Sequence, residues 1–141
     1  MATAGYSGTP LPQKLGLKDG QAVGFVGLPP SQNGLKSACE FASVALLDWP
    51  GLSGVRDMDV LHIFEDRRAL LEDHAEKLIG AIRRDGVIWI SWPKKSSKIP
   101  TDITEDVLRQ IFLPTGLVDI KVCAVDEIWS GLKFMIRKEL R

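Results

Sequence analysis

Apolar runs and helical stripes alternate along the chain, and this alternation predicts the fold. Residues 23–28 and 60–64 are short apolar runs bounded by glycine, proline or aspartate, a pattern typical of strands buried on both faces. Between residues 66 and 84, leucine, isoleucine and histidine recur at helical spacing while charged residues occupy the other positions. We therefore expect an amphipathic helix there, ended by Asp85-Gly86.

Residues 34–48 fit two patterns. Apolar residues from Leu35 to Leu46 are spaced as in a helix, whereas residues 43–49 also fit a strand that Pro50-Gly51 closes. We expect a helix from 34 to about 42, followed by a strand that ends near Asp48. A short helix at residues 12–15, stopped by a glycine, precedes the first strand.

The second half of the chain continues the alternation. Residues 87–92 form the next expected strand, and a helix runs from a cap at Thr101 or Asp102 to about residue 113, with Asp102 and Glu105 spaced as a capping box. Residues 119–125 and 132–137 are predicted as an antiparallel pair of strands. The order predicts a three-layer, Rossmann-like α/β fold, with a mainly parallel sheet and an antiparallel C-terminal strand. Residues 10–141 form one domain behind a flexible tail, residues 1–9.

Composition narrows the function classes. The chain has 141 residues, is 45% hydrophobic, and carries 18 basic and 18 acidic residues, so no overall field gathers polyanions or anionic lipid. Its two cysteines lack metal-site spacing and read as buried thiols, and we expect no metal. No apolar run approaches the roughly 20 residues of a membrane span, and the start lacks a signal-peptide pattern. We expect a cytoplasmic protein without membrane contact.

Three segments carry a family resemblance: WISWPKK, PTDIT and VDIKVCAVDEIWSGLK. With them the chain, from Leu15 to Arg137, resembles a bacterial family known only as a domain of unknown function. That resemblance implies a shortened methyltransferase-like Rossmann domain and no established activity. Residues 29–58 match the family least.

The candidate site lies where the parallel strands end. Ligands of open parallel sheets bind beyond the carboxyl ends of the strands, which places five connecting loops on one rim. The predicted ligand-binding residues come from two of these loops: Trp92, Lys94, Lys95, Lys98, Thr101, Asp126, Glu127, Trp129 and Ser130.

Two interpretations of this rim stay open. The lysines, together with amides at a helix start near Thr101, suit a phosphate or carboxylate. Alternatively, the lysines pair with Asp126 and Glu127 and the loop is only a solvated connection. Trp92 and Trp129 could stack a base, although the balanced charge disfavours a nucleic-acid partner.

An enzyme site has less support. Gly24-Phe25-Val26-Gly27 followed by Asp48 resembles part of a dinucleotide or S-adenosylmethionine site, but Pro29-Pro30 occupies the turn where glycines would admit the ligand. The sequence therefore predicts no cofactor. Both histidines, His62 and His74, fit satisfied core positions, and the serines lack a nucleophile motif.

The main functional prediction is a non-catalytic module that binds a small anionic ligand or a protein partner at the rim. The alternative is a reduced S-adenosylmethionine-dependent methyltransferase-like enzyme. The sequence does not indicate an oligomeric state.

Overall fold

A computed structural model describes residues 9–141, so the expected tail lies outside the described residues except for Thr9. Six strands form one sheet: β1 (Ala22–Val26), β2 (Ser43–Leu47), β3 (Met58–Phe64), β4 (Ile82–Pro93), β5 (Leu117–Ala124) and β6 (Trp129–Ile136). Their order across the sheet is β2-β1-β3-β4-β6-β5. β1 to β4 are parallel, and β6 runs antiparallel between β4 and β5. The predicted mixed sheet is confirmed.

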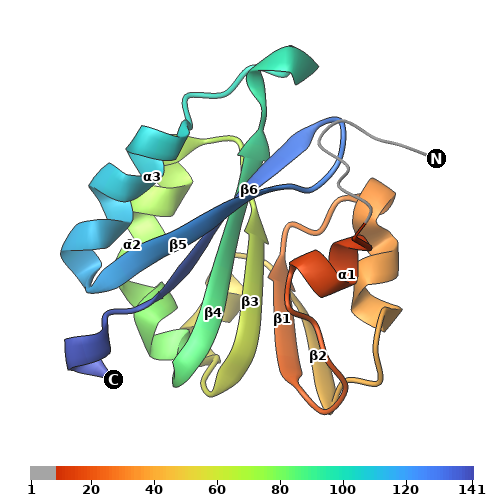
Figure 1. Ribbon diagram of the computed structural model, residues 1–141. Coiled ribbons are helices and arrows are strands. Elements are labelled where there is room, and N and C mark those ends of the chain that lie inside the picture. The colour runs from red at the N-terminus through yellow and green to blue at the C-terminus, as the bar shows by residue number, and fades with distance from the viewer. Residues whose placement is uncertain (1–8) are drawn as a thin grey trace.

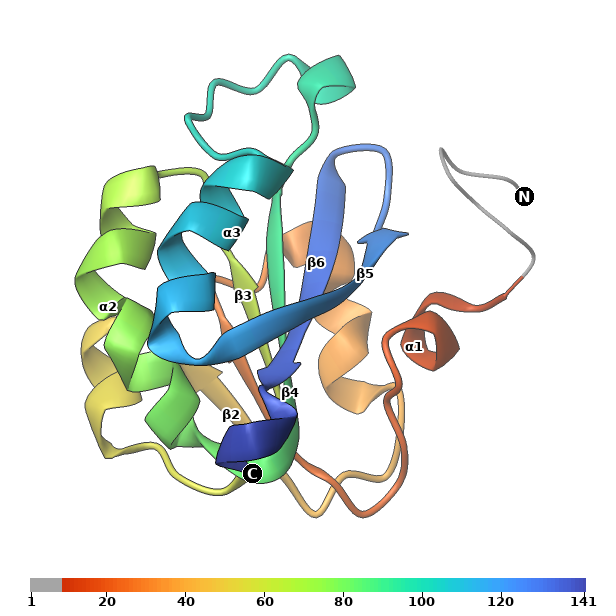
Figure 2. The ribbon, with the colours of Figure 1, turned by 60° about the vertical axis from the view of Figure 1, so that its left-hand side comes forward.

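Helices cover both faces of the sheet, as Figures 1 and 2 show. α2 (Arg68–Ala81) and α3 (Glu105–Phe112) lie on one face, while α1 (Leu11–Lys14) and the 3-10 helix η1 (Pro30–Ser37) lie on the other. The remaining 3-10 turns are η2 (Pro50–Gly54), η3 (Lys95–Ser97), η4 (Leu113–Thr115) and η5 (Lys138–Leu140). The expected three layers are therefore present.

Each face of the sheet has its own apolar core. Under α2 and α3, Phe112 and Phe134 are fully buried together with Leu71, Leu78 and Leu108. On the α1 and η1 face, Phe25 and Trp89 fill the centre, and the Trp89 Nε1–H donates to the Leu15 carbonyl at 3.0 Å. Strands between two cores must be apolar on both sides, which is why β1 and β3 are apolar runs.

The helix boundaries differ from three predictions. The segment after β1 forms the 3-10 helix η1, which starts earlier than expected because Pro29 and Pro30 favour a helix start. The following strand, β2, confirms the strand expected to end near Asp48. The long helix ends at Ala81, since Ile82 has an extended backbone and pairs with Met58 in the sheet.

The third difference concerns α3. It starts at Glu105 and its cap is Thr104, whose hydroxyl accepts from the Val107 N–H at 3.2 Å, so a cap at Thr101 or Asp102 is wrong. Asp102 instead accepts from the Arg68 N–H at 2.8 Å, at the first residue of α2. Asp102 therefore bonds to the start of α2 instead of capping α3.

Candidate functional site

The predicted rim exists, because the loops that follow the parallel strands lie at one edge of the sheet. Pro93 pairs with Trp129, and the Lys94 N–H donates to the Ile128 carbonyl at 2.7 Å. The loop that begins at Lys94 and the connection between β5 and β6 are therefore neighbours. This confirms the expectation that Lys95 and Glu127 lie on the same edge.

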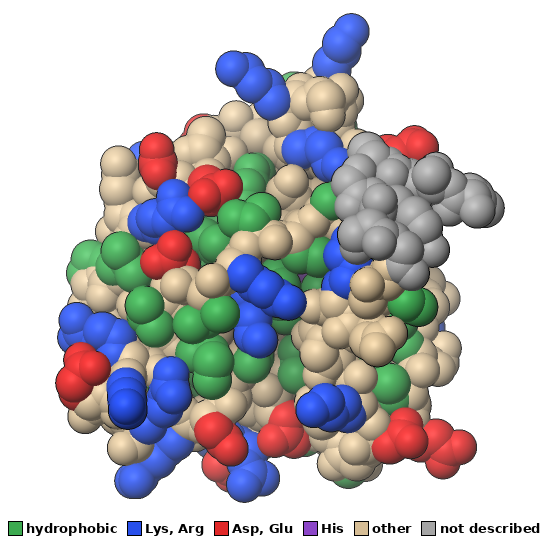
Figure 3. Space-filling view, in the orientation of Figure 1, with side chains coloured by type: hydrophobic (Ala, Val, Ile, Leu, Met, Phe, Trp, Pro, Cys, Tyr) green, Lys and Arg blue, Asp and Glu red, His purple; other side chains and the backbone are tan. Residues whose placement is uncertain are grey.

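The lysine loop projects from this edge. Ser97 closes a 3-10 turn by donating to the Lys94 carbonyl at 2.7 Å, and Lys98 has a left-handed backbone with φ of 62°. Lys94 is half-buried, whereas Lys95 and Lys98 are exposed, and lysine side chains stand out at the top of Figure 3 over this loop. Within residues 9–141, no ion pair joins them to Asp126 or Glu127. The lysine–acid pairing considered from the sequence is absent.

The helix amides expected beside the lysines lie farther along the chain, because α3 begins only at Glu105, after the loop has returned to the helical layer. Thr101 fixes that return by donating its hydroxyl to the Asp66 carbonyl at 2.7 Å. The helix N-terminus that the sequence placed at Thr101 or Asp102 therefore lies at Glu105.

The acidic and aromatic residues of the predicted site have structural roles. One oxygen of Asp126 accepts from the N–H groups of Ile128 and Trp129, both at 2.8 Å, and the other accepts from Gln32 Nε2 at 2.8 Å. Trp129 packs edge-on against Phe64, with ring centroids 5.2 Å apart.

Three further predicted residues stand around this connection. Trp92 is only 8% exposed and belongs to the core, so its ring offers no open stacking platform. Ser130 is bonded into β6 between its partners on β4 and β5, and Glu127 is exposed.

A cleft opens at the same edge, between the ends of β1 and β2. It has a volume of about 410 Å³ and is lined by Phe25, Gly27, Leu28, Asn33, Leu46, Leu47 and Asp48. Gly27 has φ of +69°, and a Cβ there would lie 2.7 Å from the Phe64 carbonyl oxygen, so only glycine fits where β1 ends beside β3. The exposed Asp48 keeps one carboxylate oxygen on the Gly51 N–H at 2.8 Å.

The first glycine of the run serves packing. A Cβ on Gly24 would lie 3.2 Å from Leu61 Cδ1 and 3.4 Å from Leu47 Cδ1, both in or against the core under α2. Only the second glycine, Gly27, borders the cleft. The proline turn that follows starts η1 and leaves the hollow open between Gly27 and Asp48.

Comparison with known proteins shows the fold of the chain. No family model matches it, and no curated protein matches it. Among solved structures, an S-adenosylmethionine-dependent methyltransferase from Aquifex aeolicus is similar, with 16% identity, a TM-score of 0.66 and coverage of 89% of this chain and 87% of that chain. The chain has a methyltransferase-like Rossmann fold.

Two further structures agree with this. A TehB-like S-adenosylmethionine-dependent methyltransferase from Corynebacterium glutamicum has 11% identity and a TM-score of 0.60 over 84% of this chain and 82% of that one. Magnesium protoporphyrin IX methyltransferase from Synechocystis, solved with bound S-adenosylmethionine, has 11% identity and a TM-score of 0.60 over 84% of this chain and 71% of that one. At such identities the likeness concerns the fold alone.

In folds of this kind, ligands bind outside the carboxyl ends of the strands where the strand order reverses. Here that point lies between β1 and β3, because the chain moves from β1 to β2 on one side and from β3 to β4 on the other. The cleft lies on the β2 side of this point. On the β3 side, the bond between Gln32 and Asp126 ties η1 to the β5–β6 connection.

Glu65, at the end of β3, was missed by sequence reasoning. One of its oxygens accepts from Trp49 Nε1 at 2.7 Å, and the other accepts from the N–H groups of Asp66 and Arg67 at 2.9 and 3.1 Å. The carboxylate therefore holds the loops after β2 and β3 together beside the cleft. An acid directly after an apolar strand was the available signal.

The two histidines are structural, as expected. His62 is 1% exposed, and its Nε2 shares a 2.7 Å hydrogen bond with Ser91 Oγ. Burial lowers the pKa of His62 to about 3, so the ring is neutral at neutral pH and is closed off from any substrate. His74 bonds to the Leu70 carbonyl at 2.9 Å and stacks on Trp49.

A further hollow, between α2 and α3, does not form a built site. The groove between α2 and α3 has a volume of about 560 Å³, but side chains of both charges line it and it is open to solvent.

Across the described part of the chain, no three potential metal ligands lie together. Both cysteines are free, with Cys123 buried and Cys39 half-buried. None of the helices in residues 9–141 combines the length and apolar character needed to cross a membrane.

Proposed function

We propose that this protein binds S-adenosylmethionine through its adenosine part in the β1–β2 cleft, as a reduced S-adenosylmethionine-dependent methyltransferase-like protein. The observation that carries the proposal is the cleft itself: an open hollow between the ends of the first two strands, with Gly27 on one side and Asp48 on the other. In the related dinucleotide-binding fold, an acid in this region bonds to the ribose hydroxyls.

The residues present fit the adenosine part. Leu28 and Leu46 offer apolar walls for the base, and Asn33 offers an amide to its polar edge. Within residues 9–141 only one oxygen of Asp48 is bonded, so the other is available to accept from a ribose hydroxyl. When bound, S-adenosylmethionine supplies an activated methyl group, and the residues named here bind and orient its nucleoside.

Pro29-Pro30, which the sequence analysis took as evidence against a cofactor, does not close the cleft. The prolines do replace the glycine-rich turn, but they direct the chain into η1 rather than into the cleft. Their rigidity also fixes one wall of the hollow before any ligand arrives, which lowers the entropy cost of binding.

Isothermal titration calorimetry with S-adenosylmethionine, S-adenosylhomocysteine, adenosine and methionine tests the proposal. We expect saturable binding of the three adenosine-containing compounds and none of methionine. Asp48→Asn should weaken binding by roughly ten- to a hundredfold, because a hydrogen bond to a charged group contributes about 1.5–3 kcal/mol. Asp85→Asn, on an exposed aspartate of β4, is the matched control and should leave binding unchanged. Failure of all three compounds to bind at millimolar concentration contradicts the proposal.

A second function, recognition of a small anion or an acidic partner by the rim, is favoured by the exposed lysines. Lys95 and Lys98 have no carboxylate partner within residues 9–141, so their charge is available. Replacing Lys94, Lys95 and Lys98 by alanine should change the unfolding free energy by no more than about 0.5 kcal/mol and remove salt-sensitive binding of phosphate-bearing ligands. If the triple variant instead unfolds readily, the lysines stabilise the fold and this second function is wrong.

We also propose, on the resemblance of the WPKK and CAVDEIWSGLK segments, that the chain belongs to the bacterial family of unknown function and acts in the cytoplasm. The comparisons support only the coarser statement about its fold.

A further inference from the structure

The two edges of the sheet differ in how they are protected. An edge strand presents unpaired N–H and C=O groups, and monomeric proteins usually blunt it with charges, prolines or bulges. The β5 edge has such devices: Asp119 and Lys121 lie in the strand, and the pairing with β6 is irregular between them. Charges and an irregular pairing therefore oppose the addition of another strand at the β5 edge.

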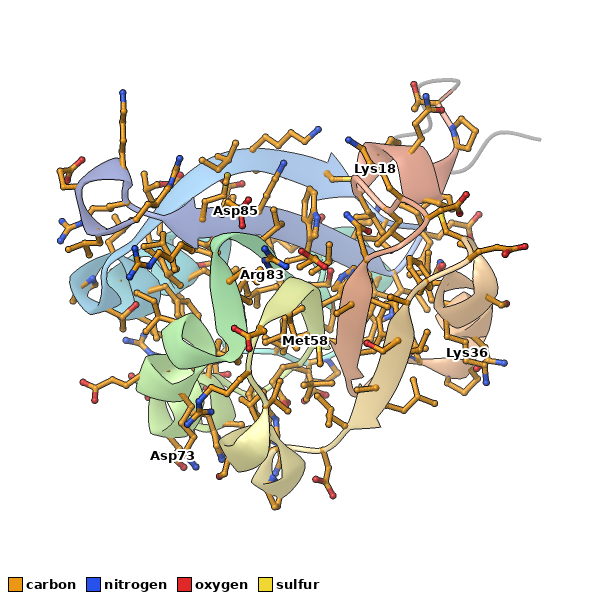
Figure 4. The ribbon with its side chains drawn as sticks, turned by 90° about the horizontal axis from the view of Figure 1, so that it is seen from below. Lys18, Lys36, Met58, Asp73, Arg83 and Asp85 are labelled. Carbon is orange, nitrogen blue, oxygen red and sulfur yellow. The ribbon has the colours of Figure 1, made fainter. Side chains whose placement is uncertain are left out.

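The β2 edge has none of these devices. Residues 43–47 read Ser-Val-Ala-Leu-Leu, with no charge and no proline, and they pair regularly with β1 along their whole length. Val44 and Leu46 expose 42% and 58% of their surfaces. Figure 4 shows β2 at the margin of the sheet, with no further strand along its outer side.

The backbone of β2 is also open on that side. Among the described residues, the one backbone bond of the strand besides its ladder with β1 is from the Ser43 N–H to the Gln21 carbonyl, at 3.4 Å. Within residues 9–141, no segment bonds to the outer edge of the strand. A short, uncharged and apolar edge of this kind is a template for another strand.

The pattern of the strand selects its partner. About a twofold axis through Ala45, antiparallel pairing places Val44 of one copy opposite Leu46 of the other, and Ser43 opposite Leu47, so no like charges meet. The charged residues nearest the strand are Glu40 before it and Asp48 after it, and in this register Asp48 faces Ala42 of the other copy. The contact therefore depends on the apolar pairs and the open backbone rather than on opposite charges.

We propose that two copies of this chain join through β2 in antiparallel orientation and form one continuous sheet across a twofold axis. The inference rests on the edge alone and does not depend on what the cleft binds. Val44 and Leu46 are the residues that this contact would bury.

Light scattering after size-exclusion chromatography, over a wide range of chain concentration, measures the expected state. We expect a mass of twice the 15.5 kDa of one chain. Val44→Lys with Leu46→Lys should give the monomer, because four lysines would meet across the axis. Ile120→Lys with Val122→Lys makes the same change on β5, at residues that are 47% and 48% exposed, and should leave the dimer intact.

A charge-swap experiment separates lost pairing from lost folding. Val44→Glu with Leu46→Glu should also be monomeric by itself, and mixing it with the lysine variant should restore the dimer mass, since each lysine then meets a glutamate. Circular dichroism of each variant reports its fold.

Covalent trapping gives a readout that does not depend on charged variants. Directly opposite residues of an antiparallel pair have Cβ atoms about 4.5–5.5 Å apart, close enough for a disulfide after a small adjustment. Ala45→Cys in a Cys39→Ser background should form a disulfide-linked dimer on mild oxidation, whereas Ile120→Cys in the same background should not. A wild-type chain that is monomeric at every concentration, a mixture that stays monomeric, or equal cross-linking at residues 45 and 120 would overturn the proposal.

Discussion

Acid should destabilise this protein through a single buried histidine, His62. The ring is enclosed by Phe25, Phe64 and Trp89, stacks on Phe64 at 4.2 Å, and has Ser91 Oγ as its hydrogen-bond partner. Its pKa is about 3 in the folded chain, against 6.5 when the ring is solvated. Above pH 6.5 the ring is neutral in both states, so it contributes no pH dependence there.

Between pH 6.5 and about 3, the unfolded chain binds a proton on this residue that the folded chain does not bind. The unfolding free energy therefore falls as the pH falls, by about 1.36 kcal/mol for each pH unit. Between pH 7 and pH 5 the expected loss is about 2 kcal/mol, which shifts a urea midpoint by roughly 1 M at a typical denaturant slope of about 2 kcal/mol/M.

Urea unfolding followed by tryptophan fluorescence at pH 7, 6 and 5 measures this loss. The reference is His62→Phe with Ser91→Ala, which removes both partners of the hydrogen bond and keeps a planar ring beside Phe64. We expect the difference in unfolding free energy between wild type and this variant to change by about 2 kcal/mol from pH 7 to pH 5. If that difference is constant with pH, the histidine is protonated in the fold and the reasoning from burial is refuted.

Two further predictions follow from single contacts. Lys133 lies directly opposite Lys121, and burial, followed by the Lys121 charge, lowers the pKa of Lys133. Lys133→Met should therefore stabilise the fold by about 0.2–1 kcal/mol at pH 7. It should also abolish the rise in stability that the wild type shows as the pH increases toward 10.5, and thermal unfolding at pH 7 and 10 checks both effects. Glu65→Ala should lower the unfolding free energy by roughly 1.5–3 kcal/mol, because Trp49 Nε1 and two backbone N–H groups lose a charged acceptor. The control is Asp66→Ala, at an exposed neighbour, which should change the unfolding free energy by less than about 0.5 kcal/mol. Equal losses in these two variants would show that Glu65 is not the residue that holds the loops.

The strands were predictable because burial on two faces leaves a strong local pattern. Residues 23–28 and 60–64 correspond to β1 and β3, with boundaries shifted by up to two residues. Boundaries decided by tertiary contacts were not predictable. Ile82 suits the helical stripe as well as a strand, and only its pairing with Met58 selects the strand.

The position of the rim was predictable, but the contacts within it were not. Sequence order placed the lysine loop and the β5–β6 connection on one edge, and the structure confirms this. The sequence could not show that Asp126 accepts a hydrogen bond from Gln32, a residue 94 positions earlier in the chain. Gly27 and Asp48 were recognised as a partial motif, but the direction that Pro29-Pro30 gives to the chain depends on three-dimensional packing.

The cleft and the open edge share one residue, and this links the two proposals. Leu46 lines the cleft and is also 58% exposed on β2. If a second copy pairs with β2, that copy covers the outer side of Leu46 and completes a wall of the cleft, so the dimer and the monomer would differ in affinity for a nucleoside. Coupling of this kind is reciprocal: a ligand that prefers the dimer must strengthen dimerisation by the same factor. The dimer dissociation constant, measured by sedimentation with and without adenosine, would therefore change if both proposals hold. An unchanged constant would mean that the two surfaces of Leu46 act independently.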